Sequence, residues 1–223
     1  MAEAFIVAAV RTAGGRRGGR LSGWHPVDLA AQVIDALVAR TGADPALVED
    51  VILGCVSQVG EQSTNVARNA VMASSLPESV PGTSLDRQCG SSQQALHFAA
   101  QAVMSGTMDC VIAGGVESMT RVPMFTPSAL PQKNGMGTYM SPGIRRRYPD
   151  VEFSQFTGAE MLARKYGLSK DQLDEYALTS HRRAIEATRA GRFAAEILPV
   201  EARLGDGGAI GEQHTVDEGI RFE

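Results

Sequence analysis

The sequence has few cysteines, and their number and setting bear on where the protein works. Only three occur among 223 residues, so they cannot all pair with one another. Cys55 and Cys110 lie inside the apolar runs 51–56 and 110–113. Small secreted domains instead use even sets of cysteines as a disulfide framework. Since the first residues also lack a basic segment followed by a long apolar run, we expect a reducing, cytoplasmic location.

Other absences exclude further classes of protein. No stretch reaches the roughly 18 apolar residues that a membrane span needs. The formal net charge of -4 gives no global basic field for nucleic acid. Neither C-x-x-C nor H-E-x-x-H occurs, and we expect no metal. Internal repeats are absent too, which argues against repeat architectures.

What the sequence does contain is an alternation of short apolar runs and amphipathic stretches. Strands are predicted at 5–10, 51–56, 83–85 and 111–113. Helices are predicted at 26–40, from Asn65, and at 95–103 with Gly106 as the stop. Such alternation favours an α/β fold with a mixed, mostly parallel sheet.

The character of the sequence changes near Ser118, where prolines and methionines become frequent. We therefore divide the chain into an α/β domain at 1–118 and a loop domain at 119–223. Two helices are expected in the second part. One spans about 158–166, and the other begins after Ser169, whose spacing to Gln172 fits a capping box.

Cys89 differs from the other two cysteines because small and polar residues surround it, immediately before a predicted helix. Backbone N–H groups at a helix N-terminus favour thiolate over thiol and can also hold an oxyanion. Gly90 would let a substrate approach the main chain closely. The alternative is a small buried residue at a tight turn, and spacing alone does not choose between the two.

None of the four histidines has a recognisable catalytic setting. His97 lies eight residues after Cys89 on the same predicted helix, roughly 12 Å along its axis, which is too far for a base. The others, His25, His181 and His214, are interpreted as surface or satisfied structural residues.

Two further patterns are interpreted as structural rather than functional. The glycine loop 14–19 fits no register of G-x-G-x-x-G, so nucleotide binding there is not expected. The triplet Arg145, Arg146 and Arg147 is a candidate anion site, but a basic triplet between prolines is usually a solvated face.

The residues around Cys89 and the run 109–120, which contains Gly-Gly-Val-Glu-Ser-Met, resemble the thiolase family in order and spacing. The resemblance extends to Val-Arg-Thr at 10–12 with the glycine loop, to 65–68, and to blocks from 159 to 193. It implies a layered α/β/α half with a CoA-binding loop domain, and a role in lipid metabolism.

The thiolase resemblance also implies residue roles. Cys89 matches the position that accepts an acyl group from acyl-CoA, for condensation of acetyl-CoA or thiolysis of 3-ketoacyl-CoA. Arg221 resembles a CoA-contacting arginine. The substrates are coenzyme A thioesters, and no metal or redox cofactor is implied. Thiolases are commonly dimers or dimers of dimers, so a homo-oligomer is expected.

Family members are nearly twice as long, and their second half carries the activating histidine, a second cysteine and an asparagine. No Gly-His-Pro or late Cys-x-Gly occurs here. The resemblance thus implies a truncated chain that lacks the last strand of its sheet and leaves an unpaired edge. Two alternatives stay open: a non-catalytic CoA-binding or assembly fragment, and a decarboxylating condensing enzyme, against which the Gly-Gly-Val-Glu-Ser-Met run argues.

Overall fold

A computed structural model describes residues 3–205 and 207–222. It divides into two compact units, one of residues 1–127 with 194–219 and the other of 128–193 with 220–223. These bounds differ from the sequence-based division at residue 118. The first unit holds β1 (Arg11–Thr12), α1 (Pro26–Thr41), η1 (Pro45–Leu47), β2 (Asp50–Gly54), η2 (Gly60–Gln62), α2 (Val66–Ala73), β3 (Gly82–Leu85), α3 (Ser91–Met104), β4 (Val111–Gly115), β5 (Ile197–Leu198), β6 (Val200–Arg203) and β7 (Ala209–His214).

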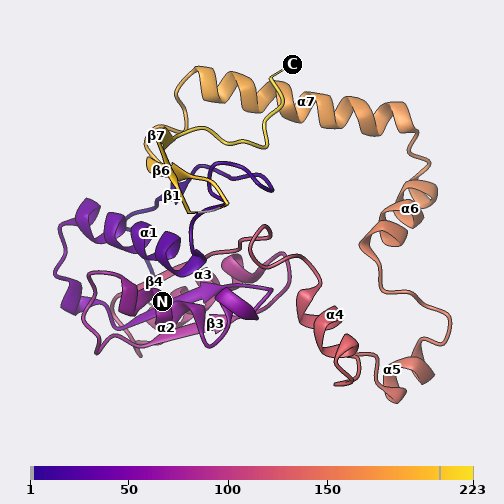
Figure 1. Cartoon of the computed structure of the whole chain (residues 1–223), viewed down its shortest axis with the longest axis horizontal. Helices are drawn as coiled ribbons and strands as arrows, with labels where there is room; N and C mark the ends of the chain where they lie inside the picture. Colours follow the sequence, from indigo (N-terminus) through magenta and orange to yellow (C-terminus); the bar gives the residue numbers. More distant parts are fainter. Residues whose placement is uncertain (1–2, 206, 223) are drawn as a thin grey trace. The chain divides into compact units, whose positions relative to one another are not determined.

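The core of the first unit is a parallel sheet with the strand order β3-β2-β4 (Figure 1). Central strand β2 turns alternate side chains to opposite faces, as the two-residue period of a strand requires. Val51 and Leu53 pack against α1 and α2, whereas Ile52 packs against Ala95 and Ala99 of α3. The sheet is therefore covered by helices on both faces, which confirms the layered α/β/α prediction.

The predicted helices of this unit form where capping residues allow. His25 caps α1 through its Nδ1, Pro26 occupies the first turn, and the left-handed Gly42 ends the helix. Asn65 caps α2 by accepting the N–H of Arg68. These starts and stops agree with the sequence-based ones because local capping chemistry decides them.

The strand predicted at 5–10 is wrong in this structure. Residues 3–10 have no strand pairing, and β1 comprises only Arg11 and Thr12, paired in parallel with β5. Phe5, Ile6 and Val7 are 78%, 73% and 86% exposed. An apolar run becomes a strand only where another strand satisfies its backbone groups, and no neighbour in the described chain does so. β3 and β4 are the two edges of the three-stranded sheet among the described residues.

A short antiparallel hairpin, β6–β7, was not predicted, because the tail from residue 205 is glycine-rich and polar. The hairpin hydrogen-bonds to the backbone that directly follows the glycine loop of the first unit. Gly23 N–H donates to Arg203 O at 2.9 Å, and Arg203 N–H donates to Arg20 O at 2.7 Å. Val200, Ala202 and His214 are buried there. Figure 1 shows the hairpin beside β1.

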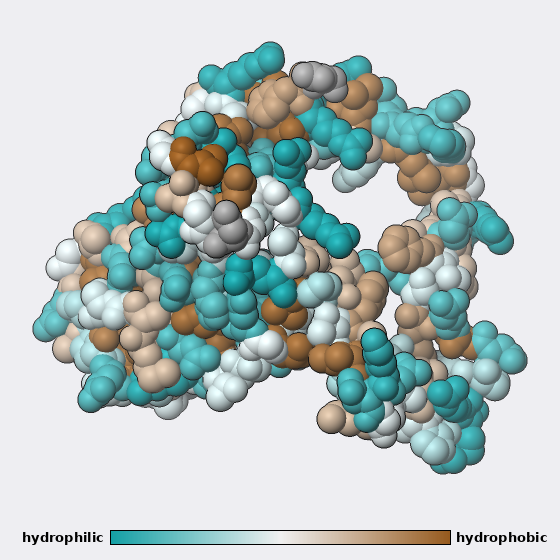
Figure 2. Space-filling model, in the orientation of Figure 1, coloured by the Kyte–Doolittle hydropathy of each residue, from teal (hydrophilic) through white to brown (hydrophobic). Residues whose placement is uncertain are grey.

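The second unit is helical and has little buried surface. It contains α5 (Pro142–Arg147), α6 (Gln155–Tyr166) and α7 (Lys170–Arg189). It also contains most of α4 (Thr126–Lys133), whose first two residues belong to the first unit. The capping box at Ser169 and Gln172 is confirmed. Large apolar side chains such as Phe156 and Tyr176 are 73% and 80% exposed, and Figure 2 shows apolar residues at the surface beside charged ones. In the described residues, no helix is long and apolar enough to cross a membrane.

Candidate active site

Cys89 lies in the short turn that joins β3 to α3, at the carboxyl edge of the parallel sheet. In open parallel sheets this edge is where ligands bind, because loops from neighbouring strands meet there. The side chain of Cys89 is exposed, in contrast to buried Cys55 and intermediate Cys110, and all three are free thiols. The structure therefore excludes the reading of Cys89 as a small buried residue and keeps its thiol accessible.

Hydrogen bonds within the turn fix its backbone on both sides of Cys89. Gln88 is left-handed at φ 49°, and its N–H donates to Asp86 Oδ1 at 2.7 Å. Ser91 Oγ donates to Gln88 O at 2.6 Å and accepts the N–H of Arg87 at 2.9 Å. A non-glycine residue with positive φ persists only where its surroundings hold it, so the turn is a preformed, tied conformation.

Two of the amides expected to bind an oxyanion are already occupied. Gly90 N–H donates to Arg87 O at 3.1 Å, and Ser91 N–H donates to Gln88 O at 3.0 Å. Both bonds close the turn itself. An oxyanion donor in this chain must therefore be another amide, such as those later in the first turn of α3, which have no acceptor inside a helix.

The start of α3 rests directly on the end of β2 because Gly54 has no side chain. A Cβ at Gly54 would lie 2.3 Å from Ser92 N and 2.4 Å from the carbonyl carbon of Ser91. The close approach places Ser91 and Ser92, two and three positions after Cys89, against the sheet, with no side chain from Gly54 between helix and strand. Backbone contact at Gly54 thus helps to set the position of the Cys89 turn, together with the packing of Ala95 and Ala99 on the sheet.

A polar network around exposed Glu117 and buried Gln62 supports the same edge of the sheet. The carboxylate of Glu117, just past β4, accepts the N–H of Val56 at 2.7 Å, that of Ser57 at 3.3 Å, and Gln62 Nε2 at 2.9 Å. Gln62 is fully buried, and its Oε1 accepts Ser118 N–H at 2.6 Å. Glu117 belongs to the Gly-Gly-Val-Glu-Ser-Met run, but only the structure gives its role as the acceptor for the loop after β2.

Burial and nearby carboxylates keep Cys55 inert. Desolvation first, then the charges of Glu117 and Asp86, raise the pKa of the Cys55 thiol to about 12. Its thiolate is therefore negligible at neutral pH, so Cys55 is not a nucleophile. The prediction that Cys55 is a core residue is confirmed by its 1% exposure.

The histidines do not supply a base for Cys89 in the described part of the chain. None hydrogen-bonds to Cys89: His25 accepts Val27 N–H at 3.3 Å, and buried His214 contacts Ala13 O at 3.1 Å through Nε2. His97 is exposed on α3, and no hydrogen bond joins it to Cys89 among the described residues. Proton transfer to and from Cys89 has no histidine partner here.

Arg221 belongs to the second unit, whereas Cys89 belongs to the first. Arg221 is exposed, and its backbone N–H donates to His181 Nδ1 at 3.3 Å. This contact supports the interpretation of His181 as a satisfied structural residue.

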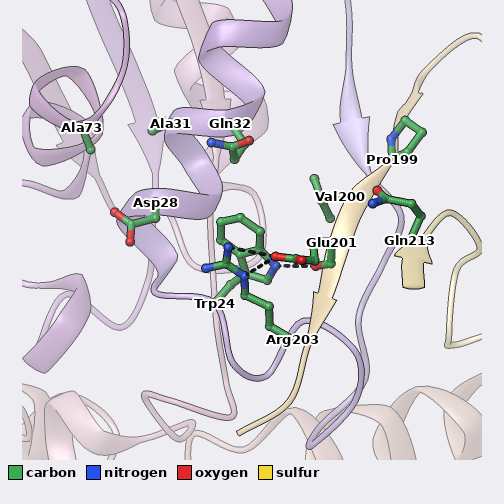
Figure 3. A pocket seen from close by; sticks show the side chains of 10 residues that line it. All are labelled: Trp24, Asp28, Ala31, Gln32, Ala73, Pro199, Val200, Glu201, Arg203 and Gln213. Carbon is green, nitrogen blue, oxygen red and sulfur yellow. Dashed lines mark hydrogen bonds and ion pairs between the residues drawn. The ribbon is translucent and has the colours of Figure 1, made fainter. Parts of the chain in front are cut away.

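A cavity of about 510 Å³ in the first unit lies between α1 and the β6–β7 hairpin (Figure 3). The Arg203 guanidinium stacks 4.0 Å from the centre of the Trp24 ring and pairs with Glu201 at 3.0 Å. Trp24 Nε1 donates to Glu201 O at 2.7 Å. Trp24, Glu201 and Arg203 are thus engaged with one another, and neither Cys89 nor Arg221 lines the cavity.

A parallel sheet covered by helices on both faces, with an exposed cysteine at a strand-to-helix turn, defines a layered α/β protein. Residues 4–223 match the family described as thiolase, N-terminal domain, and the chain belongs to the thiolase family. It is 48% identical over 223 residues to a steroid 3-ketoacyl-CoA thiolase of Mycobacterium tuberculosis, covering 99% of this chain and 53% of that protein. It is 41% identical to a 3-ketoacyl-CoA thiolase of Erwinia tasmaniensis, covering 100% of this chain and 55% of that protein.

A solved structure supports the same fold assignment. The acetyl-CoA acetyltransferase of Bacillus anthracis matches with a TM-score of 0.83 and 31% sequence identity, over 100% of this chain and 56% of that one. The chain thus spans about half the length of the curated relatives that it matches. The predictions of the thiolase family and of a missing second half agree with this coverage.

Proposed function

We propose that the chain carries the acyl-accepting site of a thiolase, with Cys89 as the nucleophile. The observation that supports this most directly is the exposed Cys89 thiol in a tied turn at the carboxyl edge of the sheet, immediately before α3. The Cys89 sulfur attacks the thioester carbonyl, a new S–C bond forms, and the bond to the CoA sulfur breaks. The thiolate of CoA leaves, and the acyl group stays on Cys89.

The acyl-enzyme then has two fates. Attack by the carbanion of acetyl-CoA forms a C–C bond and releases a 3-ketoacyl-CoA, whereas attack by CoA in the opposite direction regenerates an acyl-CoA. Two relatives are named 3-ketoacyl-CoA thiolases, and the Bacillus anthracis structure is named an acetyl-CoA acetyltransferase. Both names fit one reversible Claisen reaction, and the 3-ketoacyl-CoA substrates suit a role in lipid metabolism.

The local charge of the second unit favours binding of the CoA moiety, which carries several phosphate charges. Residues 128–193 hold eleven Lys and Arg against seven Asp and Glu, although the whole chain has a net charge of -4. A local excess of cations attracts a polyanion even when the whole molecule is acidic. Arg221 is the residue of this unit that we assign to CoA contact, with coenzyme A thioesters as the substrates and no separate metal or redox cofactor.

Among the described residues, no histidine hydrogen-bonds to Cys89, so no histidine there is placed to take the proton of its thiol. A cysteine nucleophile needs a base within reach for efficient turnover. The missing base fits a chain that spans about half of its relatives. We infer that the remaining half, within a homo-oligomeric assembly, completes the machinery.

Acylation can be tested on the chain itself by intact-mass measurement after incubation with acetyl-CoA. A single acetyl adduct that is lost in Cys89→Ala and retained in Cys110→Ala supports the proposal. Cys110 is the matched control because it is a free cysteine of the same sheet, partly buried at the start of β4. No adduct at neutral pH, or an adduct that survives Cys89→Ala, refutes it.

A second candidate, a non-catalytic CoA-binding or assembly fragment, is favoured by the lack of a histidine beside Cys89. It predicts measurable CoA binding without any covalent adduct. Isothermal titration with CoA alongside the acetylation assay separates the two, since only the acyltransferase shows both binding and an adduct.

A further inference from the structure

The glycine loop, which fits no nucleotide-binding pattern, binds two carboxylates of the protein's own tail. Asp217 Oδ1 accepts Gly14 N–H at 2.6 Å. Glu218 accepts Arg16 N–H at 3.1 Å and Arg20 N–H at 3.1 and 3.2 Å through its two oxygens. Backbone N–H groups that converge in this way form an anion-binding concavity. Here the anion is built into the chain about 200 residues downstream.

Main-chain and ionic contacts tie the same two residues more firmly. Glu218 N–H donates to Gly14 O at 2.8 Å, so the tail pairs with the loop through its backbone as well. Arg11 holds Asp217 with both terminal nitrogens, at 2.7 and 3.1 Å, and Arg16 lies 3.6 Å from Glu218. Bidentate arginine–carboxylate pairs fix orientation as well as distance.

The loop is shaped to receive the Glu218 carboxylate. A Cβ at Gly19 would lie 2.4 and 2.7 Å from its two oxygens, so any side chain there would displace it. Glu218 is only 12% exposed at its side chain. Gly19 therefore leaves open the space that the Glu218 carboxylate occupies.

The electrostatics agree with a carboxylate that stays ionised. The hydrogen bond from Arg11 first, and then that from Gly14 N–H, lower the pKa of Asp217 below its ordinary value, against an opposing effect of burial. The interaction thus persists across the whole neutral range.

We propose that Asp217 and Glu218 are positioning residues, which fasten the tail to the glycine loop and so order the segment that presents Arg221. This rests on the proposed role of Arg221 in CoA contact. Only Gly219 and Ile220 separate Glu218 from Arg221 along the chain. Because Arg221 N–H donates to His181 Nδ1 at 3.3 Å, the glycine-containing link would be held at that end alone without the clasp, and ordering each free residue on binding costs about 1 kcal/mol or more. The carboxylate clasp, defined as Asp217 and Glu218 on the loop 14–20, removes much of that cost before CoA arrives.

Hydrogen exchange of the 223-residue chain without any ligand tests the clasp directly. Asp217→Asn and Glu218→Gln are expected to raise the exchange of the amides of residues 216–222 about tenfold. Glu212→Gln is the matched control, because Glu212 pairs with the Arg20 side chain at 2.6 Å but accepts none of the loop amides. Unchanged exchange in both clasp variants, with native circular dichroism, overturns the proposal.

CoA titration then separates positioning from general stabilisation. Asp217→Asn is expected to weaken CoA binding about tenfold in the wild-type background and to have no further effect in Arg221→Ala, since the clasp acts through Arg221. Additive losses in the double variant overturn the positioning role. Weaker binding in Arg221→Ala with no change in either clasp variant overturns the clasp alone. No change in Arg221→Ala overturns the proposed role of Arg221 itself, and the positioning for CoA with it.

Discussion

The contact between Gly54 and the start of α3 gives a sharp prediction about how the Cys89 turn is held. In Gly54→Ala the new Cβ would lie 2.3 Å from Ser92 N, whereas ordinary contacts begin at 3.4 Å. The first turn of α3 must therefore move by about 1 Å, and overpacking of this kind costs about 1–3 kcal/mol. With a urea dependence of about 2 kcal/mol/M, a loss of 2 kcal/mol lowers the unfolding midpoint by about 1 M.

The same shift should also slow the acylation of Cys89. Misplacement of a reacting group by about 1 Å can cost a hundredfold in rate, so native Gly54→Ala should acquire the acetyl adduct far more slowly than wild type. Gly90→Ala is the stability control, since its Cβ would meet nothing closer than Arg87 O at 3.6 Å. Its urea midpoint should stay close to that of wild type. Equal midpoints and equal acetylation rates in Gly54→Ala and wild type would refute the idea that backbone contact positions the turn.

Three further outcomes follow from the geometry. Alkylation of the native protein at pH 8 should label Cys89 and spare Cys55, because burial raises the pKa of the Cys55 thiol to about 12; peptide mapping that finds Cys55 labelled first would contradict this. Glu117→Gln should destabilise the fold by about 0.5–1.5 kcal/mol in urea titrations, since an amide offers one acceptor oxygen where the carboxylate offers two; an unchanged midpoint would argue against the network. Because its folded pKa is lowered, Asp217 contributes stability above its unfolded pKa near 3.8, and that stability is lost as the pH falls through the lower folded value. Asp217→Asn should therefore flatten the decline in melting temperature below about pH 4, and a parallel decline in both proteins would count against the Arg11 contact.

Local chemistry explains which elements could be predicted from the sequence. The helices at α1, α2 and α7 begin at side-chain caps and alternate apolar and polar faces, and those features lie within a few residues. The apolar run 5–10 fails as a strand for the opposite reason. Its pattern is correct, but a strand depends on a partner, and residue patterns within one segment do not show whether that partner is present.

The candidate site likewise has some features that the sequence predicts and others that it does not. The exposed setting of Cys89 follows from its small and polar neighbours, and the structure agrees with it. The role of Glu117 does not follow from its sequence, because its donors, Val56 and Ser57, lie about 60 residues away. The expectation that the first amides of the helix are free fails at Gly90 and Ser91, since the turn uses them.

The sequence by itself determined that the chain is α/β, where most of its longer helices form, and that Cys89 alone of the three cysteines lies among small and polar residues before a helix. Periodicity, caps and nearby polarity are short-range properties, so a single sequence contains them. Only the tertiary structure decided how the turn is held against Gly54, and that the tail carboxylates Asp217 and Glu218 fill the glycine loop. Those contacts join residues up to 203 positions apart, where the folded backbone, rather than any local pattern, sets which groups meet.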